Sequence, residues 1–142
     1  MSVKATAKTQ IDNEPDLIES LESIYGKGKI SIKPEGVNVR GYSSDVKPTI
    51  IVGVDKLIGT AGYYLNPTSG KYELVYDSSD RWRLSDLIPQ TDKNGNVTNR
   101  LAQVYSKIKV KKALKNLRGG RIFSETVDDD GNINIKVKVS SY

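Results

Sequence analysis

The sequence of 142 residues contains no cysteine and no histidine. Without them the chain cannot form a disulfide framework, a zinc site of the Cys/His type or a thiolate nucleophile. A Ser-His-Asp triad and a histidine general base are excluded for the same reason. Any catalysis would have to use Asp, Glu, Lys, Tyr or Ser. We therefore expect no enzyme activity, no cofactor and no metal.

Long apolar runs are also missing. No stretch approaches the roughly 20 apolar residues of a membrane span. The N-terminus, MSVKATAKTQ, lacks the apolar core of a secretory signal. We therefore expect a cytoplasmic location. The length favours a single domain, residues 1–142, with residues 1–10 as a flexible N-terminal segment.

Acidic residues are absent from one segment. Residues 107–121, KIKVKKALKNLRGGR, contain seven basic residues and no Asp or Glu, in a chain whose net charge is +5. The other 127 residues hold 15 basic and 17 acidic side chains and sum to −2. The whole positive excess therefore lies in this segment.

Two helices are predicted. DNEPDLIESLESIYG predicts the first, with Asp12 or Asn13 as its cap and Pro15 in its first turn. A longer helix is predicted from Val97 to Leu117, before a Gly-Gly pair that would end it.

Alternating or uniformly apolar stretches predict the strands. KISIKPEGVNVRGY is typical of a hairpin, PTIIVGV of a central strand, and IGTAGYYLN with KYELVYD of a pair joined by a turn. RIFSETVDDDGNINIKVKVSSY predicts a last hairpin, and RWRLSDLIPQ a short helix whose Trp82 and Leu84 cover the core. The predicted fold class is α+β, an antiparallel sheet of about six or seven strands with two main helices packed on one face.

Six short stretches and one tryptophan recur in a family known to us. They are KTQI (8–11), LIESL (17–21), VRGY (39–42), GKYELVYD (70–77), Trp82, LAQVY (101–105) and DGNINIKV (130–137). In this order and spacing the chain resembles the hypothetical chloroplast open reading frame thirty-five family. This is a domain of unknown function from plastids, cyanobacteria, other bacteria and some phages.

The resemblance covers nearly the whole chain. The chain differs from the family pattern at LIGTAGYY, where family members carry an Asp-Ile-Gly-Phe run. It also differs at TDKNGNVTN, which is an insertion. It implies no established activity. Because some members are encoded near an AAA-type ATPase, it implies an accessory role beside such a partner. It also implies the interior of a plastid or of a phage-infected cell, so the protein would be viral in the second case.

KYELVYD allows two interpretations. In the structural one, Tyr72, Leu74 and Tyr76 face the core and Asp77 caps the next turn. In the functional one, a ligand-binding pocket is formed by Arg40, Tyr42, Glu73 and Asp77, with the arginine holding an anion. We favour the structural interpretation. An enzyme using Glu73 and Asp77 is disfavoured, because residues i and i+4 of a strand lie about 13 Å apart, beyond the roughly 5–10 Å of sugar hydrolases.

The basic segment is the second candidate site. Lys107, Lys111, Lys115 and Arg118 fall on one helical stripe, and Arg121 follows. The stripe can bind nucleic acid, dock an acidic protein, or be only a solvated face. It offers no aromatic side chain for base stacking beyond Tyr105. We predict a small non-catalytic accessory protein that binds a protein partner or a small anionic, nucleotide-like ligand. Weak sequence-independent nucleic-acid binding is the alternative.

Overall fold

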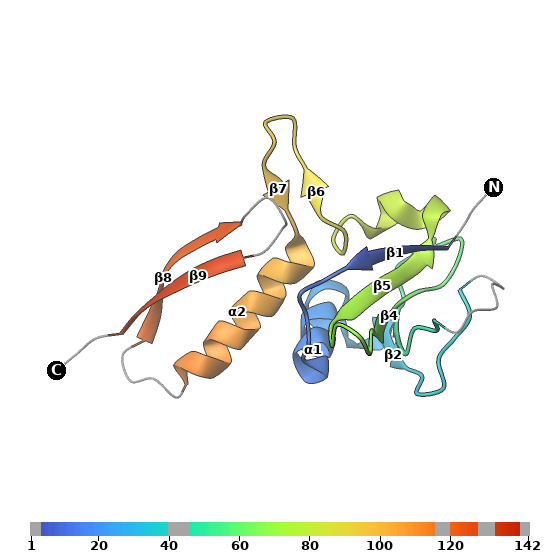
Figure 1. The fold of residues 1–142 in the computed structure, drawn as a ribbon, viewed down its shortest axis with the longest axis horizontal. Helices are drawn as coiled ribbons and strands as arrows, with labels where there is room; N and C mark the ends of the chain where they lie inside the picture. Colours follow the sequence, from blue (N-terminus) through green and yellow to red (C-terminus); the bar gives the residue numbers. More distant parts are fainter. Residues whose placement is uncertain (1–3, 40–45, 116–119, 128–132, 140–142) are drawn as a thin grey trace.

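A five-stranded antiparallel sheet packs with two α-helices, and the α+β prediction is confirmed (Figure 1). The computed structural model describes residues 4–39, 46–115, 120–127 and 133–139, with side chains described up to residue 115. The strand order is β1-β5-β4-β3-β2. The strands are β1 (Lys4–Lys8), β2 (Ile30–Ile32), β3 (Ile50–Val52), β4 (Ala61–Leu65) and β5 (Tyr72–Asp77).

Strand β5 pairs with β1 on one side and with β4 on the other. Leu74 lies opposite Ala7 of β1 and Tyr63 of β4. All six residues of β5 are buried, so both faces of this strand are covered. The predicted alternation is confirmed, since Tyr72, Leu74 and Tyr76 all belong to the hydrophobic core.

Helix α1 (Glu14–Tyr25) begins as predicted. The Asn13 side chain accepts a hydrogen bond from the backbone N–H of Asp16 at 3.0 Å, and Pro15 lies in the first turn. Gly26 follows the last turn with φ of 101°, a conformation that favours glycine. The helix therefore has a side-chain cap at its start and a glycine at its end.

Helix α2 (Arg100–Leu114) is shorter than predicted. Asn99 caps it by accepting from the backbone N–H of Ala102 at 3.1 Å. The predicted first residues instead form β7 (Val97–Thr98), which pairs with β6 (Gln90–Thr91) in a small hairpin. The Asp92 carboxylate closes this hairpin by accepting from the backbone N–H groups of Asn94 and Asn96.

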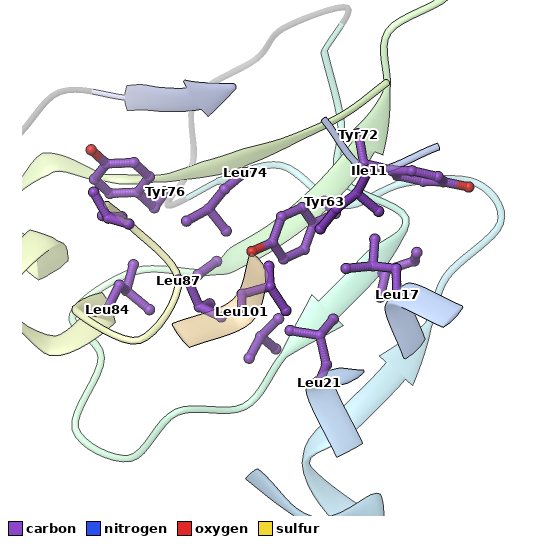
Figure 2. Close-up of a cluster of buried hydrophobic side chains, with 14 of the residues drawn as sticks. Ile11, Leu17, Leu21, Tyr63, Tyr72, Leu74, Tyr76, Leu84, Leu87 and Leu101 are labelled. Atoms are coloured by element: carbon purple, nitrogen blue, oxygen red, sulfur yellow. The ribbon is translucent and has the colours of Figure 1, made fainter. Parts of the chain in front are cut away.

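One hydrophobic core joins both helices to one face of the sheet (Figure 2). Side chains from β3, β4 and β5 meet side chains from α1, α2 and the segment that follows β5. Its largest fully buried members are Leu17, Leu21, Ile50, Tyr63, Leu74, Tyr76, Leu84, Leu87 and Leu101.

The N-terminal segment differs from the prediction. Residues 4–8 of the expected flexible segment form β1, an edge strand. Its pattern, Lys-Ala-Thr-Ala-Lys, lacks large apolar residues because Ala5 and Ala7 lie opposite the bulky Tyr76 and Leu74 of β5. Small residues fit there because β5 already fills the space.

The hairpin expected around Pro34 is also different. Strand β2 forms, but its partner is β3, with Ser31 opposite Ile51. Residues 37–39 form no strand, although Val37 donates its N–H to the carbonyl of Pro48 at 3.0 Å. The last predicted hairpin forms as β8 (Gly120–Val127) and β9 (Ile133–Val139), a separate sheet beside α2 (Figure 1).

The segment after β5 forms a 3-10 helix, η2 (Ser78–Leu84). Leu84 is fully buried, as predicted, but the placement of Trp82 in the core is wrong, because it is 70% exposed. With three residues per turn, positions 82 and 84 point in different directions. The helix can therefore bury only one of them.

We expect Leu74→Ala to lower the free energy of unfolding by about 2–5 kcal/mol, because it empties a fully buried site in the core. Trp82→Ala is the matched control and should change stability by less than about 0.5 kcal/mol, since its side chain is exposed. Urea denaturation of both variants measures this. Equal losses would contradict the placement of the two side chains.

Candidate functional site

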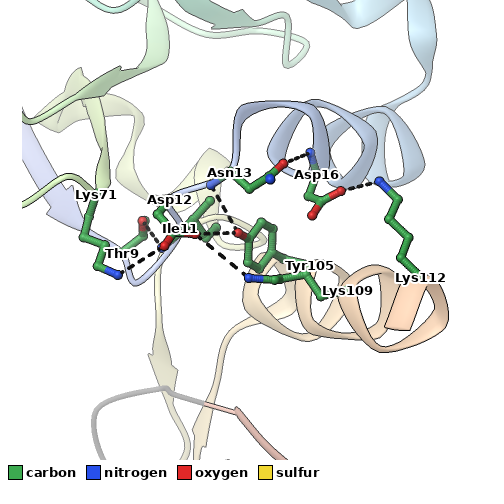
Figure 3. Close-up of polar contacts among 9 residues, drawn as sticks. All are labelled: Thr9, Ile11, Asp12, Asn13, Asp16, Lys71, Tyr105, Lys109 and Lys112. Carbon is green, nitrogen blue, oxygen red and sulfur yellow. Dashed lines mark hydrogen bonds and ion pairs between the residues drawn. The ribbon is translucent and has the colours of Figure 1, made fainter. Parts of the chain in front are cut away.

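The contact between the two helices contains a partly buried ion pair. Lys112 of α2 hydrogen-bonds Asp16 of α1 (Figure 3). Its ammonium also lies 3.0 Å from the carboxylate of Glu19. Asp16 is buried, and its backbone carbonyl accepts from the Ser20 hydroxyl at 2.6 Å. The hydrogen bonds to Asp16 and then to Glu19 raise the pKa of Lys112. This lysine is therefore used to attach α2 to α1.

A second group of contacts surrounds Tyr105. Its hydroxyl accepts from the backbone N–H of Asn13 and donates to Oδ1 of Asp12, both at 3.3 Å (Figure 3). The ammonium of Lys109 lies 5.5 Å from the Tyr105 ring centroid and 4.0 Å from Asp12. Lys71, the residue before β5, lies 3.6 Å from the same carboxylate. Lys109 thus faces the segment that leads into α1.

The remaining lysines of α2 point elsewhere. Lys107, Lys111 and Lys115 are exposed. Within the part of the chain that the structure describes, Lys111 and Lys115 make no ion pair. Residue Arg118 lies outside the described residues. The backbone of Arg121 belongs to β8, but its side chain lies outside them too. Three of the five predicted members of the stripe are therefore placed on one helix.

The candidate pocket on β5 is only partly described. Glu73 is buried and accepts a hydrogen bond from the Asn66 amide at 2.6 Å. Asp77 is fully buried and accepts from the backbone N–H of Ser79 at 2.9 Å, so the predicted cap is confirmed. Arg40 and Tyr42 lie outside the described residues. Their approach to Glu73 stays a prediction.

The two carboxylates also do not converge. Glu73 and Asp77 lie on the same side of β5 but four residues apart, about 13 Å along an extended strand. Tyr64, opposite Glu73 on β4, has a raised pKa because of burial and then the negative charge of Glu73. The arrangement thus supplies local structure and no paired acid and base.

A fourth buried carboxylate, Asp80, was not predicted as important. It accepts hydrogen bonds from the backbone N–H groups of Ile58 at 2.7 Å and Gly59 at 2.8 Å. The guanidinium of Arg83 also lies 3.4 Å from it. Asp80 therefore fixes the loop before β4 against η2 and holds Arg83 in place.

Arg83 in turn lies over the ring of Trp82, with its Cζ atom 4.1 Å from the ring centroid. The neighbouring Arg81 is exposed and donates from Nη1 to the Tyr76 hydroxyl at 3.0 Å. The run Asp-Arg-Trp-Arg at 80–83 is the sequence signal for this cluster. It was missed because Trp82 was assigned to the core.

Two tyrosine hydroxyls, those of Tyr25 and Tyr63, are buried without a hydrogen-bond partner among the described residues. Burial, and then the negative charge of Asp86, raises the pKa of Tyr25 to about 12. Burial raises the pKa of Tyr63 well above its ordinary value of 10.0. Both side chains therefore stay neutral in the folded protein far into the alkaline range.

The described residues contain no group of three or more carboxylates that could hold a metal ion. None of the helices in this part of the chain is both long and apolar enough to cross a bilayer. No family model, curated protein or solved structure matches the chain. The family resemblance is therefore a hypothesis that rests on the motifs quoted above.

The tyrosines predict how stability changes with pH. Unfolded tyrosine loses its proton near pH 10.0, whereas Tyr63 keeps its proton in the fold. The stability that Tyr63 contributes is therefore complete below pH 10 and falls above it, by at most about 1.4 kcal/mol per pH unit. We expect Tyr63→Phe to flatten this fall in urea denaturation between pH 10 and 12. The pKa of Lys112 is also raised, so the stability that this lysine contributes is still lost at alkaline pH in the Tyr63→Phe variant. A variant with the parent's slope would contradict the prediction.

Proposed function

We propose that this protein is a small non-catalytic accessory protein whose α2 lysines dock an acidic surface of a protein partner. The observation that carries the proposal is the division of the α2 lysines. Lys112 contacts Asp16 and Glu19 of α1, and Lys109 contacts Asp12, which lies just before that helix. Lys111 and Lys115, in contrast, are exposed and have no ion pair in the described part of the chain.

A non-catalytic role is supported by the state of the buried acids. Glu73, Asp77 and Asp80 each accept hydrogen bonds from groups of the protein itself. Such bonds stabilise the charged carboxylate and fix its direction. They explain why three acids are buried without requiring a substrate.

The shape of the basic face favours a macromolecule over a small ligand. Lys107, Lys111 and Lys115 follow one another at intervals of about 6 Å along the helix. Small ligands bind in concave sites that surround them, whereas a helix surface is convex. An acidic protein surface can meet several of these lysines together, and charge complementarity would speed its association.

Nucleic acid is the weaker candidate for this face. Tyr105, the one aromatic residue of α2, is buried and contacts Asp12 and Asn13, so it cannot stack on a base. Charge alone would give weak binding that falls steeply with salt. The resemblance implies an AAA-type ATPase as the partner, and an acidic face on such a protein would suit these lysines.

The test is chemical cross-linking of the protein in a nuclease-treated extract of its source cells, read by mass spectrometry. We expect cross-links from Lys107, Lys111 or Lys115 to one partner. The double variant Lys111→Glu/Lys115→Glu should lose that partner, because like charges would now face each other.

The matched control is Lys27→Glu/Lys33→Glu, which changes the net charge equally at two exposed lysines outside α2. It should keep the partner. Equal loss in both double variants would show a general charge effect and contradict the proposal. A partner that is cross-linked in an untreated extract but lost after nuclease treatment would favour nucleic acid.

A further inference from the structure

Trp82 is exposed but held in place. Its side chain is 70% exposed, the most open of the large apolar residues in the described ranges. Arg83 covers one face of the ring, and Asp80 holds Arg83. Asp80 is itself fully buried and fixed by two backbone N–H groups. A buried carboxylate thus orients an indole ring whose other face meets solvent.

The surroundings of the ring are basic. Arg81 is exposed and uses one guanidinium nitrogen for Tyr76, which leaves further N–H donors. Lys56 is exposed in the loop that Asp80 holds, two residues before Ile58. Of the acids in this loop and in η2, Asp80 accepts three hydrogen bonds and Asp55 pairs with Lys29 at 3.0 Å. Arg81 is thus an exposed cation next to Trp82 in the chain, and Lys56 is an exposed cation in the loop that Asp80 fixes to the same segment.

The small exposed apolar area at Trp82 and Ile58 favours a nucleobase over a protein surface as the binding partner. A stable protein interface buries about 800 Å² on each partner, but the exposed apolar side chains here are only Trp82 and Ile58 among the described residues. A nucleobase needs just one open ring face, and its phosphates need nearby cations. Bases within a duplex already stack on each other, so the strand must be single.

We propose that Trp82 is a stacking site for a base of single-stranded nucleic acid, with Arg81 and Lys56 contacting the adjacent phosphates. This goes beyond the docking role of α2. Segment η2, at the end of β5, lies far from the C-terminal part of α2 (Figure 1). The two surfaces can therefore act independently.

The experiment uses the full chain, in which Trp82 is the one tryptophan. A dye-labelled short oligothymidylate should quench the indole fluorescence at low salt, and the dye anisotropy gives the affinity. Trp82→Ala should weaken binding by about 5- to 150-fold, the range that base–aromatic stacking supports. Trp82→Phe should keep most of the affinity, and Arg81→Gln should lower the slope of log affinity against log salt by about one.

Further controls separate stacking from charge and from misfolding. Duplex DNA and inorganic polyphosphate should leave the fluorescence unchanged, because neither offers an unstacked base. Lys111→Gln/Lys115→Gln should quench like the parent, so this test does not depend on the function of α2. Trp82→Ala should melt with the parent, which excludes misfolding as the cause of lost binding.

The proposal would be overturned by absence of quenching by oligothymidylate at low salt. It would also be overturned by equal affinity of the parent and Trp82→Ala. Quenching by polyglutamate as strong as that by oligothymidylate would overturn it too, because this result would assign the patch to an acidic protein. None of these results bears on the cross-linking of α2, so the two proposals fail separately.

Discussion

The structure depends on the burial of β5 on both faces. A strand in this position must supply apolar side chains to the core. The polar side chains on its other face must find hydrogen-bond partners, because they are buried too. Tyr72, Leu74 and Tyr76 supply the core, to which α1 and α2 are packed. Glu73 and Asp77, on the other face, are tied to Asn66 and to the start of η2. The same strand therefore positions the helices and the segment that carries Trp82.

The distribution of charge is the second constraint on the fold, because α1 carries acidic residues and α2 carries lysines. Asp12 before α1 attracts Lys109, and Asp16 and Glu19 within α1 attract Lys112. These contacts set the rotation of α2 about its axis. Once these two lysines face α1 and the segment before it, helical geometry directs Lys107, Lys111 and Lys115 to another side. The exposed basic face is thus a consequence of how the helices pack, as well as of composition.

Much of this fold could be predicted where local pattern and packing agree. The helix α1 with its Asn13 cap, the pair β4–β5 and the Asp77 cap are all set by residues close in sequence. Strand β1 could not be predicted, because its alanines are small only to fit Tyr76 and Leu74, which are distant in sequence. Trp82 was misplaced for a related reason: which side of η2 faces the core depends on the buried Asp80 and its contacts with the loop at Ile58. For the candidate site, periodicity was enough to place the α2 lysines, but it could not distinguish those that pair with α1.

The buried acids and the exposed cations follow one physical rule. Each fully buried aspartate of the described residues accepts a hydrogen bond from the backbone: Asp77 from Ser79, and Asp80 from Ile58 and Gly59. These bonds keep the charge stable inside the protein, so the acids serve the fold. Arginine and lysine side chains are long enough to bury their stems and keep their charge in water. Arg83 links the buried acids to the exposed surface. The buried Asp80 fixes the guanidinium of Arg83, and this guanidinium lies over the exposed ring of Trp82. The buried hydrogen bonds of Asp80 therefore fix the surface side chains of Arg83 and Trp82. Fixed side chains lose less conformational entropy when a partner binds.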